Sequence, residues 1–166
     1  MIQIRYANEK DVSVIRLLAI SIWWPTYRVI LSREQIQYML DNLYDEQVLK
    51  EQMLTKQQAY ILYENNNEPI GFASFGVKSS SENCYKLHKL YCLPNQQGKG
   101  IGKQLLEFVI EEVKKKQATF LDLNVNKYNP AKSFYEKYGF EIIEEIDIPI
   151  GPYWMNDFIM RKQLKS

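Results

Sequence analysis

The sequence of 166 residues contains no apolar run that approaches the roughly 20 residues a membrane-spanning helix needs. Its first residues, Met1 to Arg5, also lack the apolar core of a signal peptide. The 21 basic side chains nearly balance the 20 acidic ones, so no broad positive surface for nucleic acid or anionic lipid is expected. These absences predict a cytoplasmic protein with no nucleic-acid partner and no membrane partner.

Cysteine and histidine are also scarce. The two cysteines, Cys84 and Cys92, fall in one predicted strand, where eight residues of extended chain separate them by about 26 Å. They cannot form a disulfide within that strand. Because there is one histidine and no Cys-x-x-Cys pair, the sequence shows no transition-metal cluster. We therefore predict metal-free chemistry in a reducing compartment.

The pattern of apolar residues predicts one α/β domain over residues 1–166. Strands are predicted at 2–6, 59–63, 70–77, 85–93, 120–125, 140–148 and 154–160. Helices are predicted after Asn8 or Asp11, with an end or a bend at Pro25, after Ser32, after Asp45, and over 101–116 and 130–138. A helix joins the strands at 85–93 and 121–125, so these two should run parallel within a mixed, mostly antiparallel sheet.

The run from Gln97 to Lys103 is the most informative part of the chain. Its glycines, Gly98, Gly100 and Gly102, remove side chains that would keep a ligand away from the main chain, and they allow conformations closed to other residues. The predicted helix that begins here presents unpaired N–H groups and the positive end of its dipole. A phosphate or pyrophosphate is the expected ligand, although a glycine turn that leads into a helix explains the same residues.

Two motifs carry a resemblance to a known family. The stretch Leu90-Tyr91-Cys92-Leu93-Pro94, followed by Gln97-x-x-Gly100-x-Gly102 and a helix, resembles the acetyl-CoA-binding motif of the GNAT N-acetyltransferases. Residues 126–140 resemble the second GNAT motif, an Asn-led helix that bears Phe-Tyr and ends in Gly-Phe. The resemblance is close over residues 85–140, and the N-terminal third is faintly similar to bacterial GNATs that acetylate spermidine and other polyamines. It implies a six- to seven-stranded GNAT-type sheet with helices on both faces, and acetyl-CoA as the cofactor.

The resemblance also implies a cofactor site made largely of main chain. Amides of the glycine loop would bind the pyrophosphate, and the main chain of Leu90 and Cys92 would pair with pantetheine as a strand does. The residues implied to bind the cofactor are Leu90, Tyr91, Cys92, Gln97, Gly98, Lys99, Gly100, Ile101, Gly102, Lys103, Asn126, Asn129 and Tyr135. Whether Asn126 or Asn129 faces the cofactor stays open, because the second motif is one residue shorter than in many members. A helix cap alone explains Asn129.

Two side chains are candidates for proton transfer. By the same resemblance, Tyr135 would protonate the departing thiolate, and its alternative is a packing role among the 12 tyrosines. His88 lies four residues before Cys92 on the same strand face, where many relatives place a glutamate that acts through water. Histidine titrates in a suitable range, so we expect His88 to be the base. A surface or packing histidine explains the position equally well.

The expected acceptor is a primary amine of a small molecule or polyamine, acetylated directly in a ternary complex. Trp24, Tyr27 and Tyr153 are candidates for binding it, because aromatic rings can surround a cationic amine. Ordinary packing of Trp23, Trp24 and Tyr27 between helices is the alternative. A peptide or protein acceptor, a non-catalytic acyl-CoA sensor and a nucleotide-binding loop are alternative functions. The last strand, 154–160, offers an edge for a homodimer.

Overall fold

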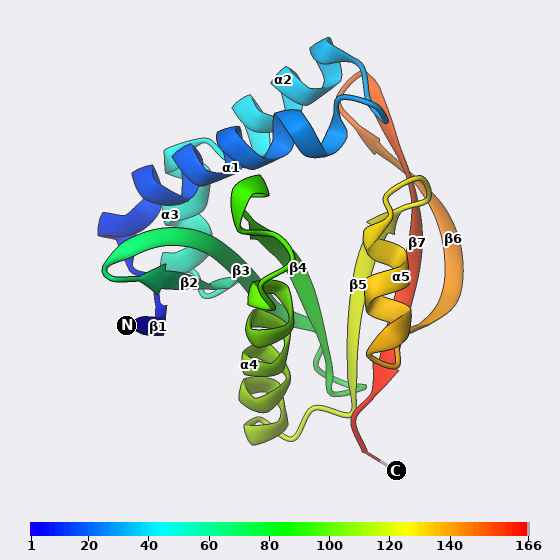
Figure 1. Ribbon diagram of the computed structural model, residues 1–166. Helices are drawn as coiled ribbons and strands as arrows, with labels where there is room; N and C mark the ends of the chain where they lie inside the picture. Colours follow the sequence, from blue (N-terminus) through cyan, green and yellow to red (C-terminus); the bar gives the residue numbers. More distant parts are fainter. Residues whose placement is uncertain (166) are drawn as a thin grey trace. The chain divides into compact units, whose positions relative to one another are not determined.

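The computed structural model describes residues 1–165, which form helices and strands joined by short turns (Figure 1). In chain order the elements are β1 (Ile2–Tyr6), η1 (Glu9–Asp11), α1 (Val12–Tyr27), α2 (Arg33–Leu43), α3 (Glu46–Leu54), β2 (Ala59–Asn65), β3 (Glu68–Ser79), β4 (Cys84–Cys92), η2 (Pro94–Gln96), α4 (Ile101–Lys115), β5 (Phe120–Asn126), α5 (Ala131–Lys137), β6 (Glu141–Ile150) and β7 (Tyr153–Gln163). The strands form one seven-stranded sheet in the order β1-β2-β3-β4-β5-β7-β6. The predicted α/β class with a mixed sheet is confirmed. Among the described residues, no helix is long and apolar enough to cross a membrane.

The chain is organised as two compact units. The first contains residues 1–76 and 88–109, and the second contains residues 77–87 and the chain from 110 onward. Strands β3 and β4 and helix α4 each begin in one unit and end in the other. The expectation of a single domain stays a prediction.

In the first unit, β1, β2 and β3 form an antiparallel meander with helices on both of its faces. Tyr60 and Tyr63 lie three residues apart on β2, so their side chains point to opposite faces. The Tyr60 hydroxyl donates to Gln52 on α3 at 2.7 Å, and the Tyr63 hydroxyl donates to Gln104 on α4 at 3.1 Å. The predicted covering of the sheet by helices on both faces is thus confirmed here.

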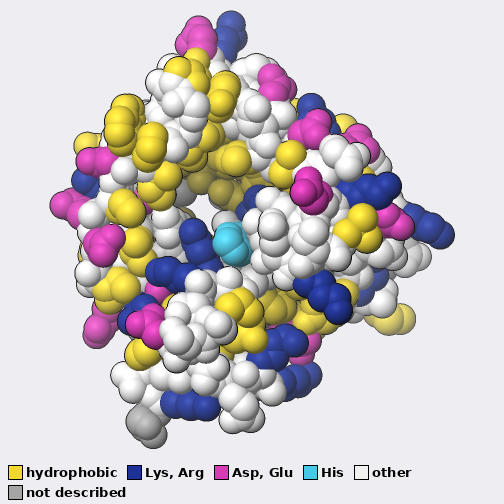
Figure 2. All heavy atoms as spheres, turned by 180° about the vertical axis from the view of Figure 1, so that it is seen from behind, with side chains coloured by type: hydrophobic (Ala, Val, Ile, Leu, Met, Phe, Trp, Pro, Cys, Tyr) yellow, Lys and Arg dark blue, Asp and Glu magenta, His cyan; other side chains and the backbone are white. Residues whose placement is uncertain are grey.

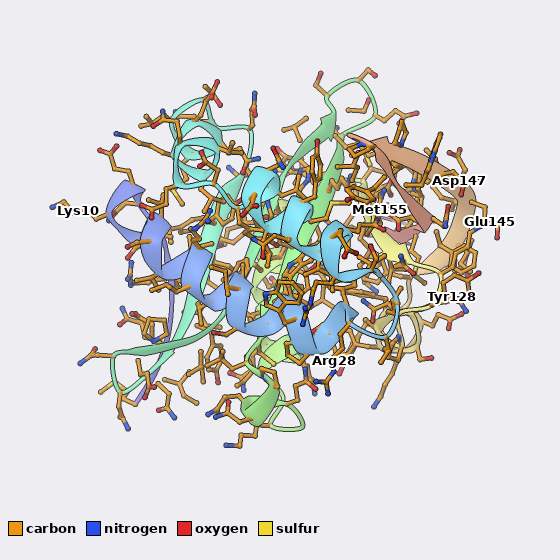
Figure 3. All side chains as sticks on the ribbon, turned by 90° about the horizontal axis from the view of Figure 1, so that it is seen from above. Lys10, Arg28, Tyr128, Glu145, Asp147 and Met155 are labelled. Carbon is orange, nitrogen blue, oxygen red and sulfur yellow. The ribbon has the colours of Figure 1, made fainter. Side chains whose placement is uncertain are left out.

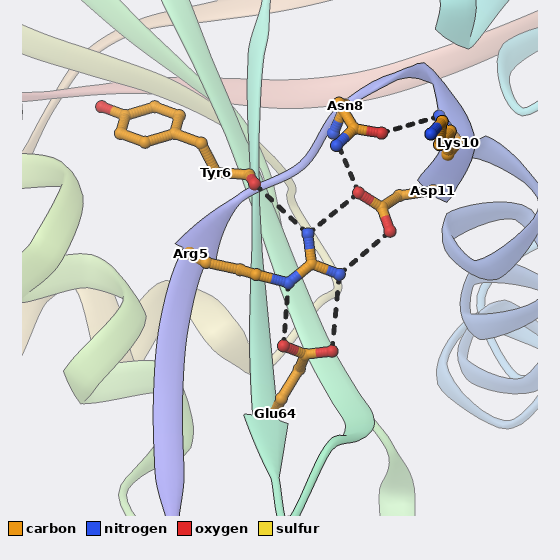
Figure 4. Close-up of polar contacts among 6 residues, drawn as sticks. All are labelled: Arg5, Tyr6, Asn8, Lys10, Asp11 and Glu64. Carbon is orange, nitrogen blue, oxygen red and sulfur yellow. Dashed lines mark hydrogen bonds and ion pairs between the residues drawn. The ribbon is translucent and has the colours of Figure 1, made fainter.

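A charged network joins the first two strands to the start of α1 (Figure 4). The Arg5 guanidinium donates to both carboxylate oxygens of Asp11 at 3.0 Å, and its Nε donates to Glu64 on β2 at 2.9 Å. The hydrogen bond from Arg5 holds the pKa of Asp11 below its usual value. Asp11 also accepts the Asn8 N–H, while Asn8 accepts the Lys10 N–H, so the same carboxylate caps the turn before α1.

The helices of the first unit begin where the capping residues predict. Ser32 accepts a hydrogen bond from the N–H of Gln35 at 3.1 Å, and Asp45 accepts from the first turn of α3. Of the two outcomes expected at Pro25, an end of the helix is wrong, because α1 continues to Tyr27. The Thr26 hydroxyl donates to the carbonyl of Ile22 at 2.7 Å, and the N–H of Arg28 donates to the carbonyl of Trp24.

In the second unit, β4 and β5 form the predicted parallel pair, with Cys84–Leu87 opposite Phe120–Leu123. Strand β7 lies between β5 and β6 and is antiparallel to both. The expectation that residues 154–160 form a sheet edge is therefore wrong, because the final hairpin folds back and inserts β7, which leaves β6 outermost. A homodimer stays a prediction, and its strand edge would be β6.

Helix α5 packs against one face of β5 and β7 (Figure 1). The Lys132 ammonium on this helix lies 5.7 Å from the ring centroid of Phe158 on β7, and Phe158 is opposite Val125 on β5. Because side chains alternate along a strand, Asp157 and Asn126 belong to the other face of this sheet. Helix α5 therefore covers the face opposite to Asp157.

A charged cluster is buried at the other end of β5. The Asp122 side chain is fully buried; its carboxylate accepts from Lys78 at 2.6 Å and from Arg161 at 2.8 and 3.0 Å. Burial raises the pKa of Asp122, but the hydrogen bonds from Arg161 and Lys78 outweigh it, so the net pKa lies below the usual value. The Arg161 guanidinium also lies 4.3 Å from the ring centroid of Phe120. This cluster ties β3, β5 and β7 together.

Candidate functional site

The glycine loop of the first unit leads directly into α4. Gly98 and Gly100 have φ angles of +82° and +80°, a region that residues with a side chain rarely adopt. The carbonyl of Gly100 accepts the N–H of Gln104 at 3.0 Å, so α4 begins just after Gly100. The amides of Ile101 and Gly102 are then in the first turn, where N–H groups have no partner within the helix.

Open space lies beside Gly98 and Gly100 in the glycine loop. A Cβ built on Gly98 or Gly100 would meet no atom within 4 Å, so packing does not require glycine at either position. What requires glycine is the positive φ, a main-chain conformation that occurs in loops whose N–H groups bind anions. Lys99 and Lys103 are exposed on the same segment and add positive charge, although Lys103 lies 3.9 Å from Glu107. The loop is suited to bind an anion.

Strand β4 leads to the loop through Leu90, Tyr91 and Cys92, all of which are half-buried. A Cβ on Gly71 of β3 would lie 3.0 Å from the carbonyl oxygen of Tyr91, so the main chains of the two strands approach closely there. Main-chain pairing of Leu90 and Cys92 with an extended ligand, in the manner of a neighbouring strand, stays a prediction. Gln97 is exposed, and its N–H donates to Pro94.

The aromatic residues predicted at the acceptor site are partly core residues of the first unit. Tyr27 is buried, and its hydroxyl is hydrogen-bonded to that of Tyr91 at 3.0 Å. Trp23 packs against Tyr27 with ring centroids 4.4 Å apart, while Trp24 is half-buried. Helix packing thus accounts for Trp23 and Tyr27. A direct contact of Trp24 or Tyr27 with an acceptor stays a prediction.

Lys89 is a cation in this region that the sequence interpretation missed. Its ammonium lies 5.3 Å from the ring centroid of Tyr44 and 5.0 Å from that of Tyr60. It also donates to the Tyr60 hydroxyl at 2.6 Å and to Gln58 at 3.2 Å. Residues 89 and 91 share one face of β4, so strand alternation alone could have placed Lys89 on the same face as Tyr91. The protein's own lysine therefore already lies among these tyrosine rings.

His88 lies on β4 and is half-buried. It is the one histidine of the chain, and its imidazole reaches the molecular surface on the face shown in Figure 2. Surface access is a requirement for a base that takes a proton from a bound amine or passes it to water. The alternative of a purely packing histidine would not require such access.

Tyr135 lies on α5 of the second unit and is 8% exposed. Its ring makes edge contacts with Phe134 and Phe140 at centroid distances of 5.3 and 5.7 Å. Its carbonyl accepts the N–H of Phe140, and Gly139 ends the helix with a φ of +90°, as the motif predicts. Two ring contacts thus restrict the orientation of the Tyr135 side chain, and a proton donor needs a fixed orientation.

Both candidate asparagines of the second unit have local structural roles. The Asn126 side chain is buried and accepts the N–H of Tyr128 at 2.9 Å, which closes the turn after β5. The Asn129 side chain accepts the N–H of Ala131 at 2.9 Å, although the residue at the N-cap position of α5 is Pro130. A cofactor contact for either residue stays a prediction. Tyr153, at the start of β7, is half-buried.

The two thiols are free and suited to packing. Burial raises the pKa of the Cys84 thiol to about 11, and burial likewise raises the pKa of Cys92. A thiol that stays protonated at neutral pH is a poor nucleophile. A covalent step at Cys92 is therefore not expected, and the contribution of its main chain to cofactor binding stays a prediction.

Comparisons with known proteins agree with this arrangement. Residues 30–148 match the acetyltransferase (GNAT) domain family. The spermidine N(1)-acetyltransferase of Thermoplasma acidophilum is 31% identical over 170 residues, which cover 99% of both chains. The ribosomal protein bS18-alanine N-acetyltransferase of Haemophilus influenzae is 39% identical over 83 residues, 50% of this chain and 53% of that protein. The crystal structure of a PaiA N-acetyltransferase from T. acidophilum with coenzyme A has a TM-score of 0.85 at 28% identity, covering 98% of this chain and 99% of the other.

Proposed function

Since this chain belongs to the GNAT acetyltransferases, we propose that it acetylates a primary amine of a small molecule or polyamine by direct transfer in a ternary complex. The enzyme class, an acetyl-CoA-dependent N-acetyltransferase, follows from the family. The observation that carries the proposal is the loop with positive φ at Gly98 and Gly100, set at the start of α4. Its amides provide the anion site that coenzyme A requires.

The first unit would hold the cofactor. Bound acetyl-CoA supplies an acetyl group that is activated as a thioester. The amides of Gly98, Gly100 and Gly102 would bind the diphosphate, and the main chain of Leu90 and Cys92 would hydrogen-bond an extended ligand like a neighbouring strand. The Cys92 N–H would polarise the carbonyl that is attacked. These contacts would fix the orientation of the thioester, which rotates freely when the cofactor is unbound.

His88 would accept the proton of the acceptor amine, directly or through water. An alkyl ammonium with a pKa of about 10.4 costs roughly 4 to 5 kcal/mol to deprotonate at neutral pH. A base placed on a rigid strand lowers this barrier in the reaction itself. Tyr135 on the second unit would donate a proton to the departing thiolate.

His88→Gln tests the base. We expect kcat/KM for the acceptor to fall about 100-fold or more, because the variant keeps a polar side chain but has no group that accepts a proton. Steady-state rates from pH 6 to 9 would show a weaker rise on the acidic side in the variant than in the unchanged protein. Unaltered coenzyme A affinity serves as the check on folding. A variant with the original rate and pH profile would leave His88 with a packing role.

Tyr135→Phe tests the acid. The hydroxyl is lost while the ring contacts with Phe134 and Phe140 are retained, so we expect kcat to fall about 100-fold or more with little change in coenzyme A affinity. Turnover is followed by thiol release, and binding by calorimetry. The matched control is Tyr138→Phe, since Tyr138 follows the same helix and packs on Phe134 at 5.0 Å. Equal turnover in both variants would remove Tyr135 from the mechanism.

A small amine is favoured as the acceptor because the spermidine-acetylating relative matches this chain along nearly its whole length. The second candidate, an amino group of a protein, is supported by the relative that acetylates the alanine of ribosomal protein bS18, although that match covers half of the chain. Free coenzyme A release with polyamines, amino acids, aminoglycosides and peptides would decide between them. Binding of acetyl-CoA without turnover on any acceptor would instead indicate a sensor.

A further inference from the structure

Strand β7 carries a buried carboxylate that lacks a complete set of partners. Asp157 is 6% exposed, and its Oδ1 has no hydrogen-bond partner within the part of the chain that the structure describes. A buried carboxylate oxygen without a donor loses its hydration and gains nothing in return. A donor from outside the chain would remove this cost.

The charged groups around Asp157 only partly balance it. Burial has the largest effect and raises the pKa of Asp157. A hydrogen bond from the Asn124 amide of β5 lowers this pKa, as do the charges of Lys86 on β4 and Lys127 after β5. Burial also lowers the pKa of Lys86, and Lys127 lies 3.2 Å from Glu145. On β6, the residue opposite Asp157 is the uncharged Ile146.

Apolar side chains extend from Asp157 toward the turn of the β6–β7 hairpin. On β7, Met155 and Tyr153 follow on the face of Asp157, and the β6 residues opposite these three are isoleucines. The apolar lane consists of Ile146, Ile148, Ile150, Tyr153 and Met155, all half-buried. The acidic residues Glu145 and Asp147 of β6 belong to the other face and are exposed; Figure 3 labels them beside Met155.

The lane has the length and chemistry of an aliphatic chain that ends in a charge. From residue 153 to residue 157, four strand steps span about 13 Å. Contact between apolar side chains and methylene groups is favourable because it removes apolar surface from water. The Asp157 carboxylate, at the end of the lane away from the hairpin turn, is complementary to an ammonium group, which has up to three N–H donors.

We propose that Asp157 binds an ammonium group of the acceptor and that the apolar lane covers the alkyl chain attached to it. This inference rests on the proposed N-acetyltransferase function. It also defines the acceptor further. An ion pair stabilises the protonated form of an amine, whereas the nitrogen that attacks the thioester must be neutral. The nitrogen at Asp157 is therefore not the one that is acetylated, and the acceptor is an aliphatic diamine or polyamine.

The test compares 1,4-diaminobutane with n-butylamine, which share the chain length and differ in the second nitrogen. We expect the unchanged enzyme to prefer the diamine at least about 10-fold in kcat/KM, the effect of one charged hydrogen bond. Asp157→Asn should abolish this preference by raising the KM of the diamine, with the KM of acetyl-CoA unchanged. Asn keeps the shape of the side chain, so thermal unfolding should confirm that the variant folds.

The matched control is Asp147→Asn, which removes the same charge from an exposed position on the other face of the same hairpin. It should keep the diamine preference. A second readout is pH. The KM of the diamine should rise as the pH falls through the raised pKa of Asp157, because protonation neutralises the carboxylate. In Asp157→Asn this dependence should disappear, which a purely structural role would not produce.

An equal loss of activity toward both amines in Asp157→Asn would overturn the inference, because it would place Asp157 at the attacking nitrogen. Unchanged preference and unchanged KM would overturn it as well. If the unchanged enzyme acetylates neither amine, calorimetry of 1,4-diaminobutane with the coenzyme A-bound protein separates the two ideas. Weaker binding to Asp157→Asn than to Asp147→Asn would support the Asp157 site and refute the proposed acceptor reaction. Equal binding would refute the site.

Discussion

Gly100→Val is expected to raise the dissociation constant of coenzyme A about 100-fold or more. Gly100 has a φ of +80°, where a residue with a Cβ is strained by about 1–2 kcal/mol and a β-branched residue by more. The added side chain would also enter the open space beside the loop, where the diphosphate is expected, and would displace charge-assisted hydrogen bonds. Titration calorimetry with coenzyme A measures the effect, and circular dichroism monitors the fold.

The control for strain is Gly151→Val. Gly151 has a φ of +57° in the exposed turn of the final hairpin, so valine there is strained in a similar way but does not alter the glycine loop itself. Its coenzyme A affinity should equal that of the unchanged protein. Normal binding by Gly100→Val would show that the diphosphate lies elsewhere, and the proposed function would lose the observation that carries it.

Asp122→Ala is expected to lower the free energy of unfolding by about 3 kcal/mol, as breaking a buried ion pair does. The carboxylate is fully buried and bonded to Lys78 and Arg161, so its removal leaves two cations beside one another without an anion. Both cations keep partial access to water, at 34% and 26% exposure, which limits the loss to the lower part of the usual range. Urea unfolding at pH 7 measures the change.

The ion pairs of Asp122 also make the free energy of unfolding depend on pH. The folded pKa of Asp122 lies below its ordinary value near 3.8, so its ionised form stabilises the fold above that value. This contribution is lost as the pH falls through the folded pKa, and the gap between Asp122→Ala and the unchanged protein should close in acid. Glu107→Ala, which removes the exposed partner of Lys103, should cost less than about 1 kcal/mol. If Asp122→Ala and Glu107→Ala lowered the free energy of unfolding by similar amounts, burial would not explain the effect of Asp122.

Local patterns predicted most elements because the relevant physics is local. Caps at Ser32 and Asp45 and the glycine that ends α5 act within one helical turn, and the structure has all three. The parallel pair of β4 and β5 followed from the helix that connects the two strands, because such a crossover joins parallel strands. The position of β7 did not, because insertion of a strand between β5 and β6 depends on pairing between distant residues rather than on alternation along β7.

The candidate site was predicted where a motif specifies main chain and was incomplete where side chains decide. A lysine between two tyrosines, such as Lys89, and a buried aspartate, such as Asp157, each depend on partners that are distant in the sequence. Alternation places both residues on a strand face, but it does not say what covers that face. The positive φ of Gly98 and Gly100, by contrast, depends on the loop itself, which explains why the sequence points to it.

The raised pKa values of Cys84 and Cys92 have a practical consequence for enzymology. Detection of released coenzyme A by disulfide reagents depends on thiolates, and at pH 7 to 8 neither thiol of the protein is appreciably ionised. The enzyme should therefore add little background absorbance to such assays, even at the high protein concentrations that weak acceptors demand. Slow turnover with poor substrates then becomes measurable without chemical blocking of the protein.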